Sequence, residues 1–191
     1  GNILNFDNLT EENIYVLDSP ILTNSQFNKF KKFFSKKIKV IDCTFDISSS
    51  LKDRIEEIRE ETETAVREGS TTLILSDKNI SNQKASIPSI LTVGAVHSHL
   101  VKQGLRGYCS LNVECSDALD THSFAVLIGV GATTVNPYLA IDSIYQRFEK
   151  KLFGKADFES CVVKFKKSID AGLLKIMSKM GISVISSYRG G

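Results

Sequence analysis

The chain has 191 residues, of which 42% are hydrophobic and 24% are charged, and its formal net charge is +2 at pH 7. These values are ordinary for one soluble globular domain that buries a sizeable core. So small a positive charge gives no general attraction to nucleic acid or to an anionic membrane. Because no apolar run approaches the roughly 20 residues of a membrane span, we also expect no membrane-embedded segment.

The four cysteines follow no metal-binding or redox spacing, and they are Cys43, Cys109, Cys115 and Cys161. We therefore favour reduced thiols packed as small hydrophobic side chains over disulfides or metal ligands. The first residue is glycine rather than methionine, and nothing that follows resembles a signal peptide. We expect a piece excised from a longer cytoplasmic protein.

Residues 1–24 are predicted to form an extended lead-in to a single α/β domain over residues 25–191. The domain begins with NSQFNKFKKFFSKK, which places phenylalanines at helical spacing with lysines between them. Aromatic residues among lysines can bind RNA or a membrane surface. The spacing of 3, 3 and 1 residues is instead typical of a helix that buries its phenylalanines, and we favour this interpretation.

The next segment is predicted to be strand, helix, strand and loop. KIKVIDCTFDI, over residues 37–47, is rich in β-branched residues and predicts a strand. A long amphipathic helix should begin after Ser50, as its N-cap, and end at Gly69. TTLILSD, over residues 71–77, is continuously apolar, which is typical of a strand covered on both faces. The polar residues 79–86 predict a loop.

An unusually apolar helix is predicted over residues 87–104, with Ser86 as its N-cap and Pro88 in its first turn. As far as Val96 it is apolar or small on every side, and such a helix is buried on more than one face. A chain this short rarely surrounds one of its own helices. We therefore expect this surface to contact something outside the chain.

The rest of the chain continues the alternation of strands and helices. Strands are predicted over residues 108–116, 132–137 and 182–188, and helices after the N-cap Asp120 and over residues 138–152 and 158–180, with a break at Phe153 and Gly154. Gly129 and Gly131 are interpreted as the end of a helix, not as a dinucleotide-binding turn. The pattern predicts an α/β fold: a mostly parallel sheet of about five strands with flanking helices, incomplete and (βα) barrel-like.

Polar residues gather after two of the predicted strands, at the rim where α/β barrels bind ligands. These rim residues are Glu114, Cys115, Ser116, Asn136, Pro137 and Tyr138. Glu114 needs a partner, which His97, His99 or Arg106 could supply. We narrowly favour a buried polar network that fixes helix–strand packing. The alternative is that these groups line a passage between domains.

The histidines do not form a convincing catalytic or metal site. His97 and His99 lie two residues apart on a predicted helix, so their side chains project about 200° from each other and cannot share one metal. His122 lies beside Asp120 and Ser123, but adjacency along one helix start does not give the geometry of a catalytic triad. The residues alone therefore predict no catalytic, cofactor-binding or metal-binding side chain.

Several long segments resemble the central domain of glutamate synthase. They are VGAVHSHLVKQGLR, SLNVECSDALDTHSFAVLIGVGA, VNPYLA and LLKIMSKMGISVISSYRGG, with VLDSPILT upstream. Together they span most of the chain, from about Val16 to Gly191. Ser98 stands where members of the family commonly have a third histidine. The resemblance implies a barrel-like domain that joins a glutamine amidotransferase domain to an FMN-binding domain.

The resemblance further implies a non-catalytic connecting domain in an oxidoreductase that forms L-glutamate from glutamine and 2-oxoglutarate during ammonia assimilation. The isolated chain should be inactive, because FMN and the iron–sulfur cluster belong to the neighbouring domain. The amidotransferase and FMN-binding domains are its implied partners. Candidate inter-domain or passage-lining residues are His97, His99, Glu114, Ser116, His122, Asn136 and Tyr138.

Two alternatives remain beside the connecting domain. One is a free-standing small α/β-barrel enzyme that binds a phosphate-bearing cofactor such as FMN. It would need a glycine-rich anion site at the carboxyl end of a strand, and the sequence shows no such motif. The other is an RNA-binding module that uses the basic aromatic segment over residues 27–37, for which salt-dependent binding is expected.

Overall fold

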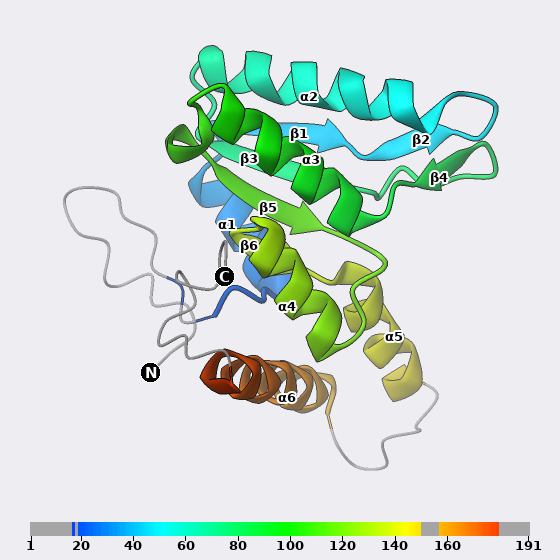
Figure 1. Cartoon of the computed structure of the whole chain (residues 1–191). Coiled ribbons are helices and arrows are strands. Elements are labelled where there is room, and N and C mark those ends of the chain that lie inside the picture. The colour runs from blue at the N-terminus through cyan, green and yellow to red at the C-terminus, as the bar shows by residue number, and fades with distance from the viewer. Residues whose placement is uncertain (1–16, 18, 150–156, 180–191) are drawn as a thin grey trace.

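The computed structural model describes residues 17, 19–149 and 157–179 (Figure 1). Three predictions lie outside the described residues: most of the extended lead-in, the break at Phe153 and Gly154, and the strand over residues 182–188.

A four-stranded parallel sheet forms the centre of the described structure. Its strands, in spatial order, are β1 (Ile38–Asp42), β3 (Thr72–Ser76), β5 (Ser110–Glu114) and β6 (Thr134–Asn136). Spatial order follows chain order, and a helix connects each strand to the next, as in a (βα) barrel that does not close. The predicted α/β class is therefore confirmed, with four strands in the main sheet among the described residues.

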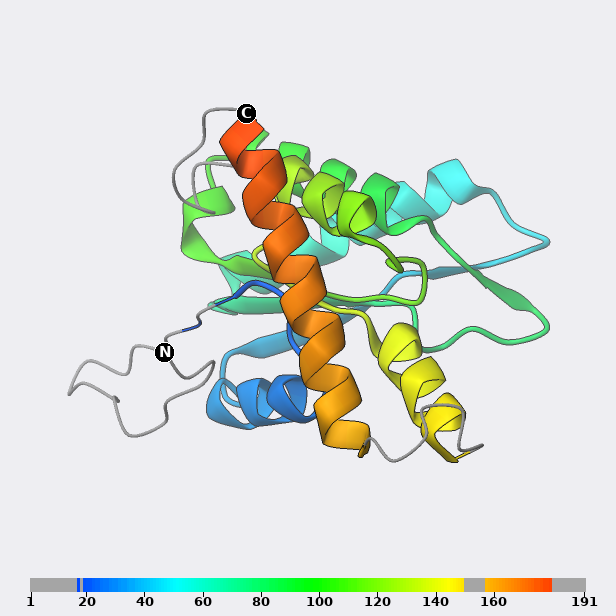
Figure 2. The ribbon, with the colours of Figure 1, turned by 90° about the horizontal axis from the view of Figure 1, so that it is seen from below.

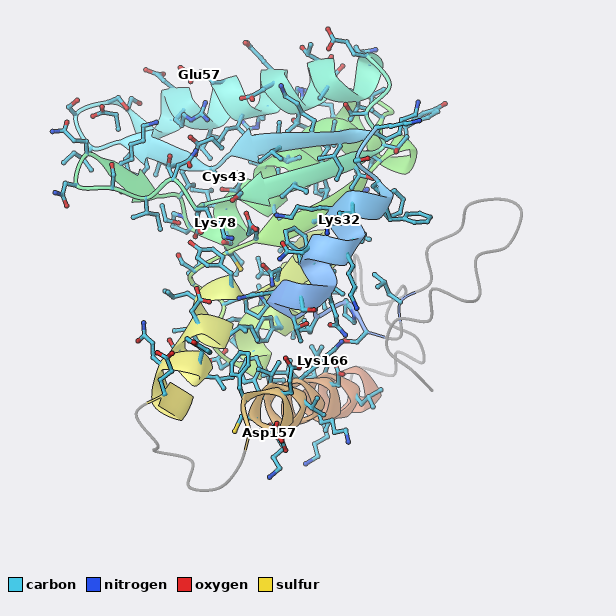
Figure 3. All side chains as sticks on the ribbon, turned by 180° about the vertical axis from the view of Figure 1, so that it is seen from behind. Lys32, Cys43, Glu57, Lys78, Asp157 and Lys166 are labelled. Carbon is cyan, nitrogen blue, oxygen red and sulfur yellow. The ribbon has the colours of Figure 1, made fainter. Side chains whose placement is uncertain are left out.

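Helices cover both faces of this sheet (Figures 1 and 3). On one face lie α2 (Leu51–Arg67), α3 (Ser89–Lys102) and α4 (Thr121–Val130), over the main hydrophobic core. On the other lies α1 (Asn24–Phe33), whose Phe27 and Phe30 are buried with Ile74 of β3. Covering both faces explains why β3 is buried at every position. The prediction that this helix buries phenylalanines is confirmed.

Two further helices flank the sheet beyond β6. These are α5 (Tyr138–Glu149) and the long α6 (Phe158–Lys179), which packs against α4 and α5 (Figure 2). Lys166 of α6 donates a hydrogen bond to Gln26 of α1 at 3.0 Å, so α6 also contacts the opposite layer. No helix among the described residues is both long enough and apolar enough to cross a membrane.

The strand predicted over residues 37–47 is in fact two strands, which is a correction. After β1 the chain turns, and β2 (Thr44–Asp46) leaves the main sheet to pair antiparallel with β4 (Lys84–Ser86). The Asp42 carboxylate stabilises this turn, because it accepts hydrogen bonds from the N–H and Oγ1 of Thr44 at 3.0 and 2.7 Å. The predicted loop over residues 79–86 was therefore partly wrong, since β4 lies in it.

The start of α3 is also corrected. The helix begins at Ser89 after Pro88, and Ser86 belongs to β4 instead of capping the helix. The cap comes from a distant residue: Asp117 accepts hydrogen bonds from the N–H of Ser89 at 2.9 Å and from its Oγ at 2.6 Å. A carboxylate from the loop after β5 thus satisfies the first turn of α3.

Five other predicted helix ends are confirmed, and the predicted ends near residues 152 and 180 lie outside the described residues. Ser50 and Asp120 are N-caps that accept hydrogen bonds from the backbone N–H three residues later. Gly69, Gly104 and Gly131 follow helices with positive φ angles, as glycine C-terminal residues do. All four cysteines are free thiols, as predicted, and three of them are buried.

Candidate functional site

The carboxyl edge of the sheet gathers a group of polar side chains that we name the carboxyl-edge network. Its members are Ser76, Asp77, Lys78, Glu114, Ser116 and Tyr138. Ser76 and Glu114 are register partners across β3 and β5, which brings them side by side. Figure 3 shows Cys43 and Lys78 near this edge, toward the β2–β4 ribbon.

Asp77 is the centre of the network and is buried. One carboxylate oxygen accepts hydrogen bonds from Ser86 Oγ at 3.0 Å and from the N–H and Oγ of Ser116 at 2.9 and 2.6 Å. The other accepts a hydrogen bond from the Tyr138 hydroxyl at 2.6 Å. With four donors on two oxygens, the carboxylate ties β3, β4, β5 and α5 together. It is a structural acceptor, because both of its oxygens are occupied by donors from the protein.

The Tyr138 hydroxyl acts as a hydrogen-bond donor to the Asp77 carboxylate. Partial burial, followed by the hydrogen bond to Asp77 and the charge of that carboxylate, raises the pKa of the Tyr138 phenol well above its usual value. The Lys78 Nζ lies 5.1 Å from the centroid of the tyrosine ring, in a cation–π contact. The phenol therefore stays protonated at neutral pH and does not act as a base.

Glu114 differs from Asp77 because one of its oxygens lacks a hydrogen bond. The residue is 5% exposed, and its Oε1 accepts a hydrogen bond from Ser76 Oγ at 2.6 Å. Its buried Oε2 has no hydrogen-bond partner among the described residues, although Lys78 Nζ and Lys31 Nζ lie 3.5 and 3.8 Å away. Glu114 thus presents the one buried acceptor of this edge whose hydrogen bonding is incomplete within the described structure.

The expectation that His97, His99 or Arg106 would pair with Glu114 is wrong. Helix α3 runs antiparallel to β5, so its last turns lie at the opposite edge of the sheet. The Arg106 Nε donates to His97 Nδ1 at 3.0 Å, and the His99 Nε2 lies 2.6 Å from Oε2 of Glu63 on α2. The two histidines therefore bond separate partners, as their spacing on a helix predicts.

Asn136 lies at the same edge of the sheet, but its side chain donates hydrogen bonds to the segment at the start of α1 and not to the carboxyl-edge network. Its Nδ2 donates to the carbonyl oxygen of Leu22 at 3.0 Å and to Oδ1 of Asn24 at 2.9 Å. The adjacent backbone continues this attachment, because Leu22 N–H donates to the Val135 carbonyl at 2.9 Å. Asn136 thus fixes the segment that precedes α1.

His122 lies apart from the other candidates, exposed at the first turn of α4. It lines a cleft of about 140 Å³ with Ser89, Ile90, Asp117, Ala118, Ser123, Val126 and Leu127. Ser123 Oγ donates to Asp120 at 2.8 Å, so the serine bonds the aspartate directly and no Ser–His–Asp chain forms. Among the described residues, no group of three or more His, Cys, Asp or Glu side chains is arranged to hold a metal ion.

Sequence reasoning missed Ser76, Asp77, Lys78 and Lys31 as members of this edge. Asp77 directly follows a continuously apolar strand, and this position was the available signal, because the carboxyl ends of parallel strands share one edge. Lys31 gave no such signal, since α1 reaches Glu114 only through packing across the sheet.

The described carboxyl edge has no glycine-rich turn of the kind that binds a phosphate. Phosphate sites in α/β folds use glycine-rich turns at the carboxyl ends of strands, where backbone N–H groups meet the anion. The three described glycines with positive φ angles, Gly69, Gly104 and Gly131, each follow a helix and lie at the opposite edge. The described carboxyl edge instead holds the buried carboxylates of Asp77 and Glu114.

Comparisons with family models and with known proteins all point to one family. The model of the glutamate synthase central domain matches residues 1–191. The glutamate synthase [NADPH] large chain of Azospirillum brasilense is 50% identical over 194 residues, covering 100% of this chain and 13% of that protein. The corresponding chain of Bacillus subtilis is 39% identical over 176 residues, covering 91% and 11%. The ferredoxin-dependent glutamate synthase of Spinacia oleracea is 37% identical over 205 residues, covering 100% and 13%.

The chain therefore spans only 11 to 13% of the length of these relatives. Solved structures share its fold at low sequence identity. DHODH from Eimeria tenella in complex with ferulenol has a TM-score of 0.52 at 15% identity, over 80% of this chain and 37% of that one. A flavocytochrome b2 with pyruvate bound has a TM-score of 0.53 at 17% identity, over 76% and 38%. Such low identities compare the fold alone.

Proposed function

We propose that this chain, which belongs to the glutamate synthase central domain family, is a non-catalytic connecting domain. In this proposal it holds the amidotransferase and FMN-binding domains of the same large chain in place. It also contributes walls to the path that ammonia takes between them. The parent enzyme would be cytoplasmic and would form L-glutamate from glutamine and 2-oxoglutarate.

The observation that carries the proposal is the saturation of Asp77. Its carboxylate accepts four hydrogen bonds, from β4, from the residues after β5 and from α5. These hydrogen bonds hold the elements together at the edge of the sheet where barrel enzymes carry their catalytic residues. Reactive carboxylates keep an oxygen accessible to substrate. A saturated acceptor at this place favours a scaffold over an active site.

The same proposal assigns the cofactors of the parent enzyme to another domain. FMN and the iron–sulfur cluster would belong to the neighbouring domain, because the described carboxyl edge of this chain has no glycine turn of the kind that holds a phosphate. Its four cysteines would have no part in the cluster: three are buried, and burial raises the pKa of the Cys43 and Cys115 thiols.

The passage-lining part of the proposal concerns two regions. Glu114, Ser116 and Tyr138 lie together at the carboxyl edge, where the Oε2 of Glu114 retains an acceptor site. Asn136 closes the same edge toward α1. His97 and His99 lie at the opposite edge and would contribute to a different inter-domain surface.

The first test is an immunoblot of the source cells with antibody raised against this chain. A single band far larger than 21.1 kDa is expected, because the relatives are several times longer. A band near 21.1 kDa would contradict the connecting-domain proposal.

The passage is tested in the full-length enzyme by the ratio of glutamate formed from 2-oxoglutarate to glutamine hydrolysed. Tyr138→Ala should lower this ratio and release ammonia to solution, because the phenol closes the carboxyl edge against Asp77. Tyr145→Ala is the matched control on the same helix, since Tyr145 is exposed. An unchanged ratio in both variants would show that this edge does not line the passage.

A further inference from the structure

A small buried cavity lies between the sheet and the first turns of α3, which covers β3 and β5 (Figure 1). Leu75 of β3 and Val113 of β5 line one side, and Ser89, Thr92 and Val93 of α3 line the other. Its volume is about 10 Å³, and every residue that lines it is no more than 6% exposed. A cavity of this size has room for one water molecule and for nothing larger.

Thr92 contributes a hydroxyl group whose hydrogen bonding is incomplete. The residue is 1% exposed. Within the described structure its Oγ1 makes a single hydrogen bond, to the carbonyl oxygen of Pro88 at 3.5 Å. Hydroxyl groups normally donate over about 2.5–3.0 Å, so this bond is weak. A buried hydroxyl that is paired so weakly still carries much of the cost of leaving water.

Thr62 of α2 shows that burial in a helix does not by itself lengthen such a bond. It is 0% exposed, and its Oγ1 donates to the carbonyl oxygen of Arg59 at 2.9 Å, which is a normal length. Thr62 does not line the cavity, whereas Thr92 does. The long bond of Thr92 therefore coincides with the cavity beside it.

Ser89 supplies an acceptor one helical turn before Thr92. Its Oγ donates to Oδ1 of Asp117 at 2.6 Å, which uses its proton and leaves the oxygen able to accept. Residues three apart in a helix lie on the same face, so the two hydroxyl groups of α3 face the same cavity. A water molecule between them has a donor on one side and an acceptor on the other.

We propose that this cavity is a binding site for one internal water molecule, which accepts a hydrogen bond from Thr92 Oγ1 and donates one to Ser89 Oγ. Polar cavities of this size retain water, whereas apolar ones stay dry. The water completes the hydrogen bonding of Thr92 and fills the gap between α3 and the sheet. The site is independent of the connecting-domain proposal, since every group that forms it belongs to this chain.

High-resolution crystal structures of the parent chain, Thr92→Val and Thr62→Val test the site. Valine keeps the shape of threonine and removes the hydroxyl. The parent chain should show one ordered water within hydrogen-bond distance of Thr92 Oγ1. Thr92→Val should lose this water, and Thr62→Val, the matched control, should keep it, because Thr62 lies outside the cavity lining.

Nuclear Overhauser effects between water and buried methyl groups give the same test in solution. Val93 and Val113 line the cavity and are 0% and 2% exposed, so surface water does not reach their methyl groups. Their signals should show contact with water in the parent chain and in Thr62→Val, and should lose it in Thr92→Val.

The parent chain alone decides whether water binds. A cavity without water, or one that neighbouring side chains fill, would overturn the site even if Thr92→Val failed to fold. Water that remains in Thr92→Val, or that is lost from both variants, would overturn the assigned role of Thr92. None of these results bears on the connecting-domain proposal, which the immunoblot tests separately.

Discussion

At the scale of single residues, Gly131 shows how close packing restricts one position. Its φ is +128°, and a Cβ added there would lie 2.5 Å from both Cγ and Nδ1 of His97. The imidazole cannot move away freely, because Arg106 bonds both its Nδ1 and the Gly131 carbonyl oxygen. Gly131→Ala should therefore lower the free energy of unfolding by about 3 kcal/mol, measured by urea denaturation.

Gly69→Ala is the control for this substitution. Its φ is +102°, but no atom lies within 4 Å of the added Cβ, so it measures the backbone cost alone. That cost should be about 1 kcal/mol. If the two variants lost the same stability, the steric role of His97 would be wrong.

Tyr138 gives a prediction at alkaline pH. Because the folded chain raises the pKa of its phenol above the unfolded value, the folded state holds this proton more tightly. The resulting stabilisation is present below about pH 10 and is lost as pH rises further, since the unfolded phenol ionises first. The parent chain should therefore lose stability more steeply above that pH than Tyr138→Phe does, in urea denaturation at a series of pH values.

The control for the alkaline prediction is Tyr108→Phe, because the Tyr108 side chain is exposed. This variant should follow the parent curve. Parallel curves for the parent chain and Tyr138→Phe would mean that the hydrogen bond to Asp77 does not retain the phenolic proton.

At the scale of elements, α6 depends on a glycine for its approach to α4. A Cβ at Gly172 would lie 2.5 Å from Cγ2 and 2.7 Å from Oγ1 of Thr121, the first residue of α4. Gly172→Ala should cost about 1–2 kcal/mol, because overpacking outweighs the higher helix propensity of alanine. The loss is measured by thermal unfolding followed by circular dichroism.

The second substitution Thr121→Ala should recover most of that loss, since it removes the two closest atoms. Added to the Gly172→Ala chain, it completes a double-mutant cycle. Simple additivity of the two variants would show that α6 and α4 do not meet through this pair.

At the scale of the whole molecule, the elements that sequence predicted well are those whose signals are local. Ser50 and Asp120 cap helices within three residues of themselves, and the buried strand β3 is apolar throughout. The features that sequence missed depend on distant partners. The start of α3 depends on Asp117, which lies 28 residues away in the chain.

The candidate site also combines features that the sequence predicted with features that it missed. The polar rim after β5 and β6 was visible in the sequence, because a polar residue after an apolar strand marks a strand end. The partners of Glu114 were not visible, since Ser76 and Lys31 reach it through sheet register and through packing of α1. The pairing of β3 with β5 and the approach of α1 to β5 join residues that lie far apart in the sequence.

At the same scale, the described carboxyl edge of the sheet leads to an expectation about FMN, and a titration tests it. This edge holds the buried carboxylates of Asp77 and Glu114, and the described glycines with positive φ angles lie at the opposite edge. We expect no saturable quenching of FMN fluorescence by the chain, because no glycine turn that could hold the phosphate is present among the described residues of this edge. Glu114→Gln should behave identically, since removing one charge does not create a cradle of backbone N–H groups. Stoichiometric binding of FMN by the parent chain would contradict the connecting-domain proposal and favour a free-standing flavin enzyme.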